Sequence, residues 1–219
     1  MSLPADSTDD LIYDARIGDL PALQTDLSTL STQLNLPTSQ IIASAIDAEP
    51  QEEGGTGCCL LHFPAANGNI EILSFLLQSL DEPARKTLLN HRNHSGNTPL
   101  HWAALNTHLE CVKALVEAGA DLAATNDAGL DAVFLAERAD WSAEEEKDEQ
   151  KDGAEAEAEV EAEAGESAPA RPMTKAREVV EWLLSSEKAA ELESGVDGGK
   201  DKSGNNAGEG PSAGDKMEE

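Results

Sequence analysis

Residues 95–127 read SGNTPLHWAALNTHLECVKALVEAGADLAATND, and the rest of the chain is interpreted from this stretch. Thr98 is a suitable N-cap, and Pro99 suits the first helical position, where its missing N–H would have had no partner. Apolar residues then recur at helical spacing from Leu109 to Glu117, and Gly119 can end that run. The stretch predicts two short helices joined by a turn. Their apolar faces need neighbouring units to cover them.

The order Thr98-Pro99-Leu100-His101, with Ala103 two positions later, is the T-P-L-H-x-A pattern of ankyrin repeats. The stretch resembles that family over its whole length. The resemblance implies units of about 33 residues, each with two antiparallel helices and a β-turn loop. The fold it implies is an all-α ankyrin-repeat solenoid of about four repeats, with a disordered acidic insertion and tail.

Similar patterns divide the rest of the chain. Ala15 aligns with Ala104 in an N-terminal capping repeat, where Asp9, Asp10 and Asp14 replace the surface that a preceding repeat would cover. The ankyrin repeats are expected over 1–141: the capping repeat 9–30, an insertion 31–55 with a short helix near Pro37, a repeat 56–90, a repeat 93–125, and the first helix of the last repeat 126–141.

The repeat over 56–90 departs from the pattern in two ways. Cys59-Leu60 replaces Thr-Pro, and Pro64 takes an alanine position inside the first helix. Since an interior proline removes a hydrogen bond and typically costs about 3 kcal/mol, this helix is expected to start late or bend. The residues beyond the usual repeat length are expected between Leu80 and Asn90.

The last repeat is expected to be split by an acidic segment. Residues 142–172 form the insertion, and positions 142–170 carry twelve acidic residues and two lysines, a net charge of −10. Low hydrophobicity with this charge is typical of disorder. The second helix of the last repeat is expected over 173–187, followed by a disordered tail over 188–219.

The charge of the whole chain restricts its partners. With 43 acidic and 15 basic residues, the formal net charge is −28, which disfavours nucleic acid and anionic membranes and favours a basic partner. The three cysteines have no framework spacing, so a reduced intracellular compartment is expected. The acidic N-terminus does not resemble a signal peptide, and no apolar run is long enough for a membrane helix.

No catalytic or metal-binding pattern stands out. The pairs His91/His94 and Cys58/Cys59 lack the spacing of known zinc sites, and no phosphate-binding loop or zinc-protease motif is present. The resemblance gives His62 and His101 a structural role. We therefore expect no enzyme activity, no metal and no cofactor.

The candidate site comes from the family, whose arrays bind through the loop tips and the exposed side of the first helices, the concave face. The position after the motif histidine belongs to that side, and here it holds Tyr13, Phe63, Trp102 and Leu135. These residues either form an apolar row for a partner helix or are partly buried between neighbouring helices. The surrounding candidates on the concave face are Asn67, His94, Asn106, Asp127, Asp131 and Trp141.

Within the family, the layout is similar to that of the fungal ankyrin-repeat chaperones that escort the KH-domain ribosomal protein of the small subunit. That similarity implies a monomeric, non-enzymatic escort in the cytoplasm and nucleus. It would shield a basic ribosomal protein before import and assembly, without binding nucleic acid or membrane. The alternatives are a generic ankyrin scaffold or adaptor in regulation or signalling, and a regulatory subunit of an enzyme complex.

The composition of the acidic insertion generates a first prediction. Replacing residues 142–170 by a short Gly/Ser linker should leave the melting temperature nearly unchanged, because this segment has too few apolar residues to contribute to a core. Thermal unfolding followed by circular dichroism measures the effect. A large loss of melting temperature would show that the segment is part of the folded structure.

Overall fold

The structure, a computed structural model, describes residues 3–139 and 174–193. The expected disorder of the acidic insertion and of residues 194–219 therefore lies outside the described residues. The helices are α1 (Ala5–Ile17), α2 (Leu20–Leu34), α3 (Thr38–Ser44), η1 (Gln51–Glu53), α4 (His62–Asn67), α5 (Ile70–Ser79), α6 (Glu82–Leu89), α7 (Pro99–Leu105), α8 (Leu109–Glu117) and α10 (Lys175–Glu193), with a further helical segment at 132–139.

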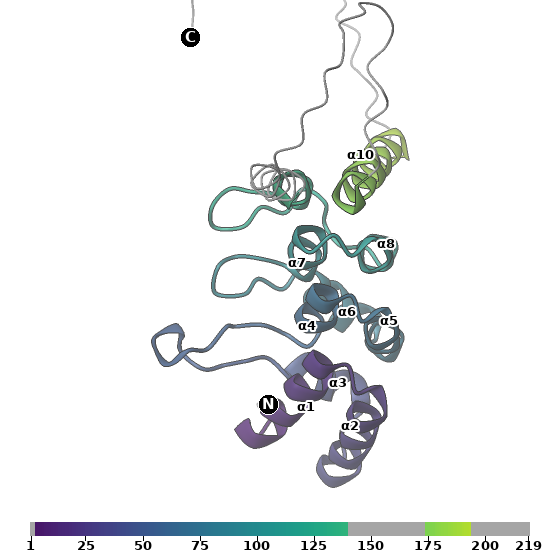
Figure 1. Cartoon of the computed structure of the whole chain (residues 1–219). Helices are drawn as coiled ribbons and strands as arrows, with labels where there is room; N and C mark the ends of the chain where they lie inside the picture. The colour runs from purple at the N-terminus through teal and green to yellow at the C-terminus, as the bar shows by residue number, and fades with distance from the viewer. Residues whose placement is uncertain (1–2, 140–173, 194–219) are drawn as a thin grey trace, which may run out of the picture.

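The helices pair and stack in one direction (Figure 1). One row holds α1, α4, α7 and the segment 132–139, and the other holds α2, α5, α8 and α10. The loops before α4, α7 and residue 132 project to the same side of the stack. In the described part of the chain this is a helical solenoid of four helix pairs, which confirms the expected all-α fold.

Buried histidines connect successive repeats. His101 Nδ1 accepts a hydrogen bond from the Thr98 backbone N–H at 3.2 Å, and its Nε2 donates to the Leu130 carbonyl, 3.1 Å away in the next loop. His62 does the same with the Cys59 N–H at 3.2 Å and the Asn97 carbonyl at 3.0 Å. Each ring therefore accepts a hydrogen bond from a backbone N–H at the start of its own helix and donates one to the loop of the following repeat. This confirms the structural role expected for both histidines.

Both rings are held neutral. Burial lowers the pKa of His62 to about 4 and also lowers the pKa of His101, because the charged form loses its hydration. Protonation would also place a proton on Nδ1, which is the acceptor in both pairs.

Pro64 lies in the first turn of its helix. The helix α4 begins at His62, so Pro64 falls in its first turn, where backbone N–H groups have no intrahelical partner. The helix starts late: the position that aligns with Pro99 is Leu60, two residues before His62. The interior proline penalty expected from the sequence therefore does not apply.

Three boundaries differ from the expected ones, and the extra residues expected between Leu80 and Asn90 form a helix. The helix α1 begins at Ala5 rather than at Asp9, and α2 continues to Leu34. The extra residues of the second repeat form a helix, α6, whose N-cap Asp81 accepts a hydrogen bond from the Ala84 N–H at 3.0 Å. The helix α10 packs beside α8 and extends to Glu193, past the expected end at 187.

Asp14 also departs from expectation. The sequence predicts that it lies with Asp9 and Asp10 on the surface that a preceding repeat would cover, and both of those residues are exposed. Its side chain is instead 7 % exposed, because this turn of α1 faces α2.

The neutral histidines generate a prediction about pH. Since the pKa of His62 is lower in the folded protein than the ordinary value of 6.5, its contribution to stability is present above pH 6.5 and is lost as the pH falls toward about 4. Over this range the free energy of unfolding of the wild type should fall more steeply than that of the variant His62→Gln, by up to about 1.4 kcal/mol per pH unit. Urea unfolding at several pH values gives the free energy of unfolding of each protein as a function of pH. Equal slopes for the two proteins would show that folding does not shift the pKa of His62.

Candidate protein-binding surface

The four candidate anchor residues occupy equivalent helix positions but differ in exposure. Tyr13 is 61 % exposed and Trp102 is partly buried, whereas Phe63 is 5 % and Leu135 is 6 % exposed. The structure therefore brings together no row of four exposed side chains. Phe63 and Leu135 are buried, and Trp102 shows the partial burial that was the alternative to an exposed row. Contact of any of the four with a partner stays a prediction.

Phe63 is covered by the first repeat. The Arg16 guanidinium lies over its ring, 4.6 Å from the centroid, in cation–π geometry. The Asn67 Nδ2 group donates to the Arg16 carbonyl at 2.8 Å and ties the end of α4 to the end of α1. These contacts explain why an aromatic residue at the expected concave position belongs to the core.

Trp102 combines a fixed orientation with accessible surface. Its ring meets the ring of His62 edge-on, with centroids 6.1 Å apart and planes at 88°. His62 is itself buried and hydrogen-bonded at both nitrogens, so it forms a rigid support for the indole. A half-covered, well-oriented tryptophan has the properties of an interface anchor.

The polar candidates mostly hold the projecting loops together. His94 Nδ1 lies 3.0 Å from the Gly55 carbonyl, and Asp127 pairs with Arg92 at 2.8 Å. Asp131 caps the segment 132–139 by accepting a hydrogen bond from the Phe134 N–H at 2.8 Å. Asn106 is exposed at the end of α7, and Trp141 lies outside the described residues.

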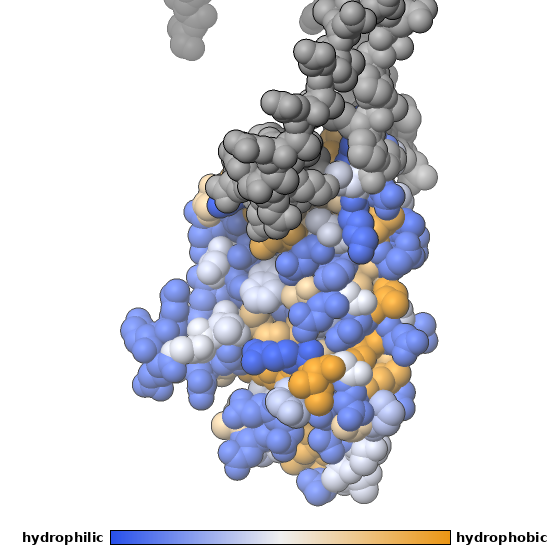
Figure 2. Space-filling model, viewed as in Figure 1, coloured by the Kyte–Doolittle hydropathy of each residue, from blue (hydrophilic) through white to orange (hydrophobic). Residues whose placement is uncertain are grey.

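Two exposed apolar residues were missed from the sequence. Ile17 is 54 % exposed one helical turn after Tyr13, and Leu105 is 44 % exposed one turn after Trp102. The i+3 and i+4 spacing from the anchors could have indicated them. On the face shown in Figure 2, hydrophobic residues form small groups among hydrophilic ones.

The buried thiols do not form a reactive site. Cys59 Sγ lies 3.2 Å from His62 Nδ1, which resembles a nucleophile and base, but burial raises the pKa of Cys59 to about 12. Burial also raises the pKa of Cys111, to about 11. The pKa of Cys58 is raised by burial as well. A thiolate is the nucleophilic form, so these groups are inert in the folded protein.

The described residues contain no cluster of three or more His, Cys, Asp or Glu side chains arranged to hold a metal ion. His91 Nε2, considered above for zinc, instead lies 2.9 Å from the Gly57 carbonyl. Within the same residues, no helix has the length and apolar character needed to cross a membrane.

Comparison with known proteins places this surface in a family. The profile of ankyrin repeats, in three copies, matches residues 32–126. A chain from the crystal structure of the yeast ribosomal protein Rps3 in complex with its chaperone Yar1 is 33 % identical, with a TM-score of 0.54; the match covers 71 % of the present chain and 99 % of that one. The chain belongs to the ankyrin-repeat family. It resembles the Yar1 chaperone, and its ankyrin repeats form a protein-binding module.

Two plant proteins share the repeats alone. XBAT31 of Arabidopsis thaliana is 46 % identical over 63 residues, and XBOS32 of Oryza sativa subsp. japonica is 46 % identical over 43 residues; their names assign both to the E3 ubiquitin-protein ligases. The matches cover 29 % and 20 % of the present chain. The chain spans about a tenth of the length of these relatives, 12 % and 9 %.

Charge is distributed unevenly along the ankyrin stack. Residues 1–84 contain thirteen acidic residues and a single basic one, Arg16, for a net charge of −12. Residues 85–139 contain six acidic and five basic residues, for a net charge of −1. The N-terminal repeats are therefore the part of the stack that attracts cations most strongly.

The contrast between Phe63 and Tyr13 generates a prediction about stability. Phe63→Ala should lower the free energy of unfolding by about 3–5 kcal/mol, because it empties a covered site and leaves Arg16 without its ring partner. Tyr13→Ala should change it by less than about 0.5 kcal/mol, as expected for an exposed position. Urea unfolding measures both, and similar losses would contradict this assignment of core and surface.

Proposed function

We propose that this ankyrin protein is a non-enzymatic chaperone that escorts a basic ribosomal protein of the small subunit. The observation that carries the proposal is the match to the Rps3–Yar1 structure, which extends over 99 % of the matched chain. A match of that extent includes the arrangement of the repeats as well as the shared repeat pattern.

The charge of the chain supports a basic client. A net charge of −28, with −12 in the first 84 residues, makes the repeats a strong electrostatic target for a polycation. A bound acidic protein would also compete with RNA for the same cationic surface of the client. Both effects would keep a newly made ribosomal protein soluble until assembly.

In this proposal the apolar anchor residues hold the bound client, and the acidic residues speed its association. Trp102, supported by the His62 ring, contacts an apolar side chain of the client. Tyr13, exposed on α1 of the first repeat, contacts the client at a second point. Acidic residues around these anchors mainly accelerate association and disfavour other partners. The protein acts as a monomer in the cytoplasm and nucleus, where such a client would be made, imported and assembled.

A binding experiment with yeast Rps3 tests the function. Mixed with Rps3, the purified chain should give a one-to-one complex by size-exclusion chromatography with light scattering, and it should prevent Rps3 from precipitating. Hen lysozyme, another basic protein, controls for plain charge attraction. If the chain binds Rps3 and lysozyme equally well, or binds neither protein, the generic scaffold or adaptor is favoured instead.

The same assay tests the anchor. Trp102→Ala should weaken Rps3 binding by about 2 kcal/mol or more, roughly 30-fold, as is usual for a central interface aromatic. Leu184→Ala is the matched control, since Leu184 is a partly exposed apolar residue on α10, in the other row of helices. If Trp102→Ala binds as well as wild type, recognition does not involve this face of α7.

A further inference from the structure

A groove with apolar walls lies in the N-terminal repeat. It separates the start of α1 from the loop after α3, and both lie on the side to which the loops of the stack project (Figure 1). Its volume is about 320 Å³, more than a leucine-sized side chain needs. The apolar residues that line it are Leu3 and Ala5 on one side, and Ile46, Ala48 and Pro50 on the other. We call this cavity the N-terminal groove.

Two polar side chains of the lining are already hydrogen-bonded within the fold. Thr8 Oγ1 donates to the Pro4 carbonyl at 3.2 Å, and Asp47 Oδ2 accepts from both the backbone N–H and the hydroxyl of Thr56 at 2.6 Å. Burial raises the pKa of Asp47, but the hydrogen bonds from Thr56 outweigh burial and the pKa lies below its ordinary value. Because these groups have their partners, the walls favour an apolar side chain over a polar one.

The loop that forms one wall is held in place by the fold itself. Ile46 pairs with Cys59 in an isolated antiparallel bridge, and the Gly55 N–H donates to the Pro50 carbonyl at 3.0 Å. A β-carbon on residue 55 would collide with the Glu49 carbonyl, so glycine lets the two sides of the loop pack closely. A groove that exists before binding avoids the entropic cost of ordering a loop around the ligand.

Carboxylates border the N-terminal groove on both sides. Asp9 of α1 and Glu49 of the loop line it, and both residues are exposed. The single basic residue among positions 1–84 is Arg16, whose guanidinium lies over the ring of Phe63. An apolar interior bordered by carboxylates is complementary to an apolar side chain that has a lysine or arginine beside it.

Charge decides among the possible occupants. The segment 142–170 of the chain carries a net charge of −10, and a second copy would bring another −12 in its residues 1–84, so both are repelled from this part of the stack. A basic protein is attracted to it. The groove also adjoins the proposed interface, because the exposed Tyr13 follows Asp9 by one helical turn on α1.

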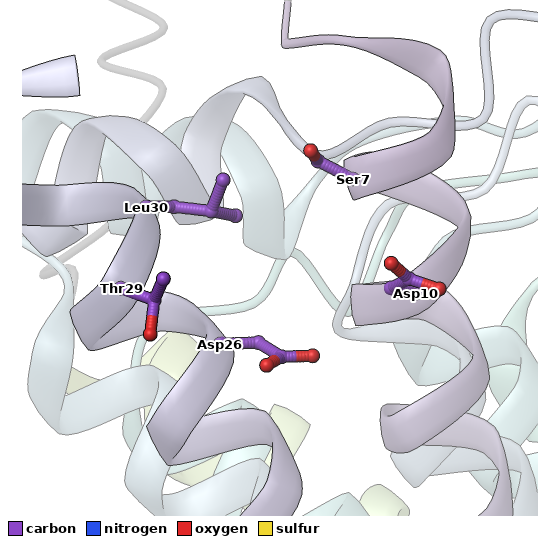
Figure 3. Close-up of a pocket in the computed structure, with 5 residues that line it drawn as sticks. All are labelled: Ser7, Asp10, Asp26, Thr29 and Leu30. Atoms are coloured by element: carbon purple, nitrogen blue, oxygen red, sulfur yellow. The ribbon is translucent and has the colours of Figure 1, made fainter. Parts of the chain in front are cut away.

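A neighbouring pocket between α1 and α2 does not suit the same ligand (Figure 3). Its volume is about 150 Å³, and four of its five lining residues are polar. The residues that line it are Ser7, Asp10, Asp26, Thr29 and Leu30. Asp9 and Asp10 are adjacent in the sequence but line different cavities, so Asp10 provides a matched control for Asp9.

We propose that the N-terminal groove binds an apolar side chain of the partner protein, and that Asp9 and Glu49 hold a lysine or arginine next to that side chain. The proposal rests on the proposed function, because it assumes a basic client. The groove gives the client a point of attachment besides Trp102. It selects an apolar residue within a basic segment, which charge attraction alone does not do.

Filling the groove tests the proposal with the client. Ala48 is exposed, so Ala48→Trp should occupy the groove without disturbing the core. It should weaken binding of yeast Rps3 at least about tenfold, because an apolar side chain of the client loses its site. Ala123→Trp, at an exposed alanine in the loop after α8, should bind like wild type. If Ala48→Trp binds Rps3 as tightly as wild type does, the proposal is wrong.

The two neighbouring aspartates separate a local contact from overall charge. Asp9→Asn and Asp10→Asn each remove one negative charge from an exposed position of α1. Asp9→Asn should weaken Rps3 binding roughly threefold more than Asp10→Asn does, which is the size of effect expected from one exposed ion pair. Equal losses in the two variants would contradict the role of Asp9.

A peptide probe separates this proposal from the proposed function. Two peptides, with a pair of lysines on each side of a central leucine or serine, are titrated into the full chain. The leucine peptide should shift the amide NMR signals of Leu3, Ala5, Ile46 and Ala48 more than the serine peptide does, and Ala48→Trp should abolish the difference. If Rps3 does not bind and the leucine peptide gives this pattern, the client is wrong and the groove stands. If Rps3 binds and the two peptides act alike, the function stands and the groove does not bind an apolar side chain.

Discussion

The hydrogen bond from a buried imidazole to the carbonyl of the next loop sets the spacing of the stack. His62 and His101 each accept from the start of their own helix and donate to the following repeat, over distances of 3.0–3.2 Å. In a solenoid each unit contacts only its neighbours, so these bonds fix the register at the two junctions that they cross, between the second and third repeats and between the third and fourth. The neutral state of both rings is a condition for this geometry, because each ring must be an acceptor at one nitrogen and a donor at the other.

The same register determines which side chains a partner can reach. Equivalent positions of the first helices hold Tyr13, Phe63, Trp102 and Leu135, yet the neighbours of each differ. Arg16 covers Phe63, and the edge contact with His62 leaves part of Trp102 accessible. Repetition of the backbone therefore does not repeat the surface. An ankyrin array acquires specificity from the side chains that each repeat places against the next.

The repeat pattern was sufficient to predict the fold, because T-P-L-H-x-A encodes a cap, a proline at the helix start and the bridging histidine together. Local departures were harder to predict. Pro64 reads as a helix breaker until the late start of α4 places it in the first turn. The residues 80–90 were expected only as extra length, although Asp81 and Pro83 together are signals for the start of the helix α6.

The candidate site was predictable only in part, for a related reason. Helix position could be read from the alignment, but the burial of Phe63 depends on Arg16, which is 47 positions earlier in the chain. The burial of Asp14 depends on how α1 faces α2, and an aspartate in an acidic segment gives no sign of it. Contacts between repeats decide exposure, and a single sequence does not contain them explicitly.

The three buried thiols can report how often the structure around them opens. Cys58, Cys59 and Cys111 are at most 1 % exposed, and burial raises the pKa of each. A thiol reagent can react with them only while the surrounding structure is open, so the labelling rate at each cysteine reports how often that part of the molecule opens. Cys59 lies at the start of the second repeat, and Cys111, whose Sγ is 3.8 Å from the Pro64 carbonyl, lies between the second and third. The unmodified protein therefore allows the motions of two neighbouring repeats to be timed separately.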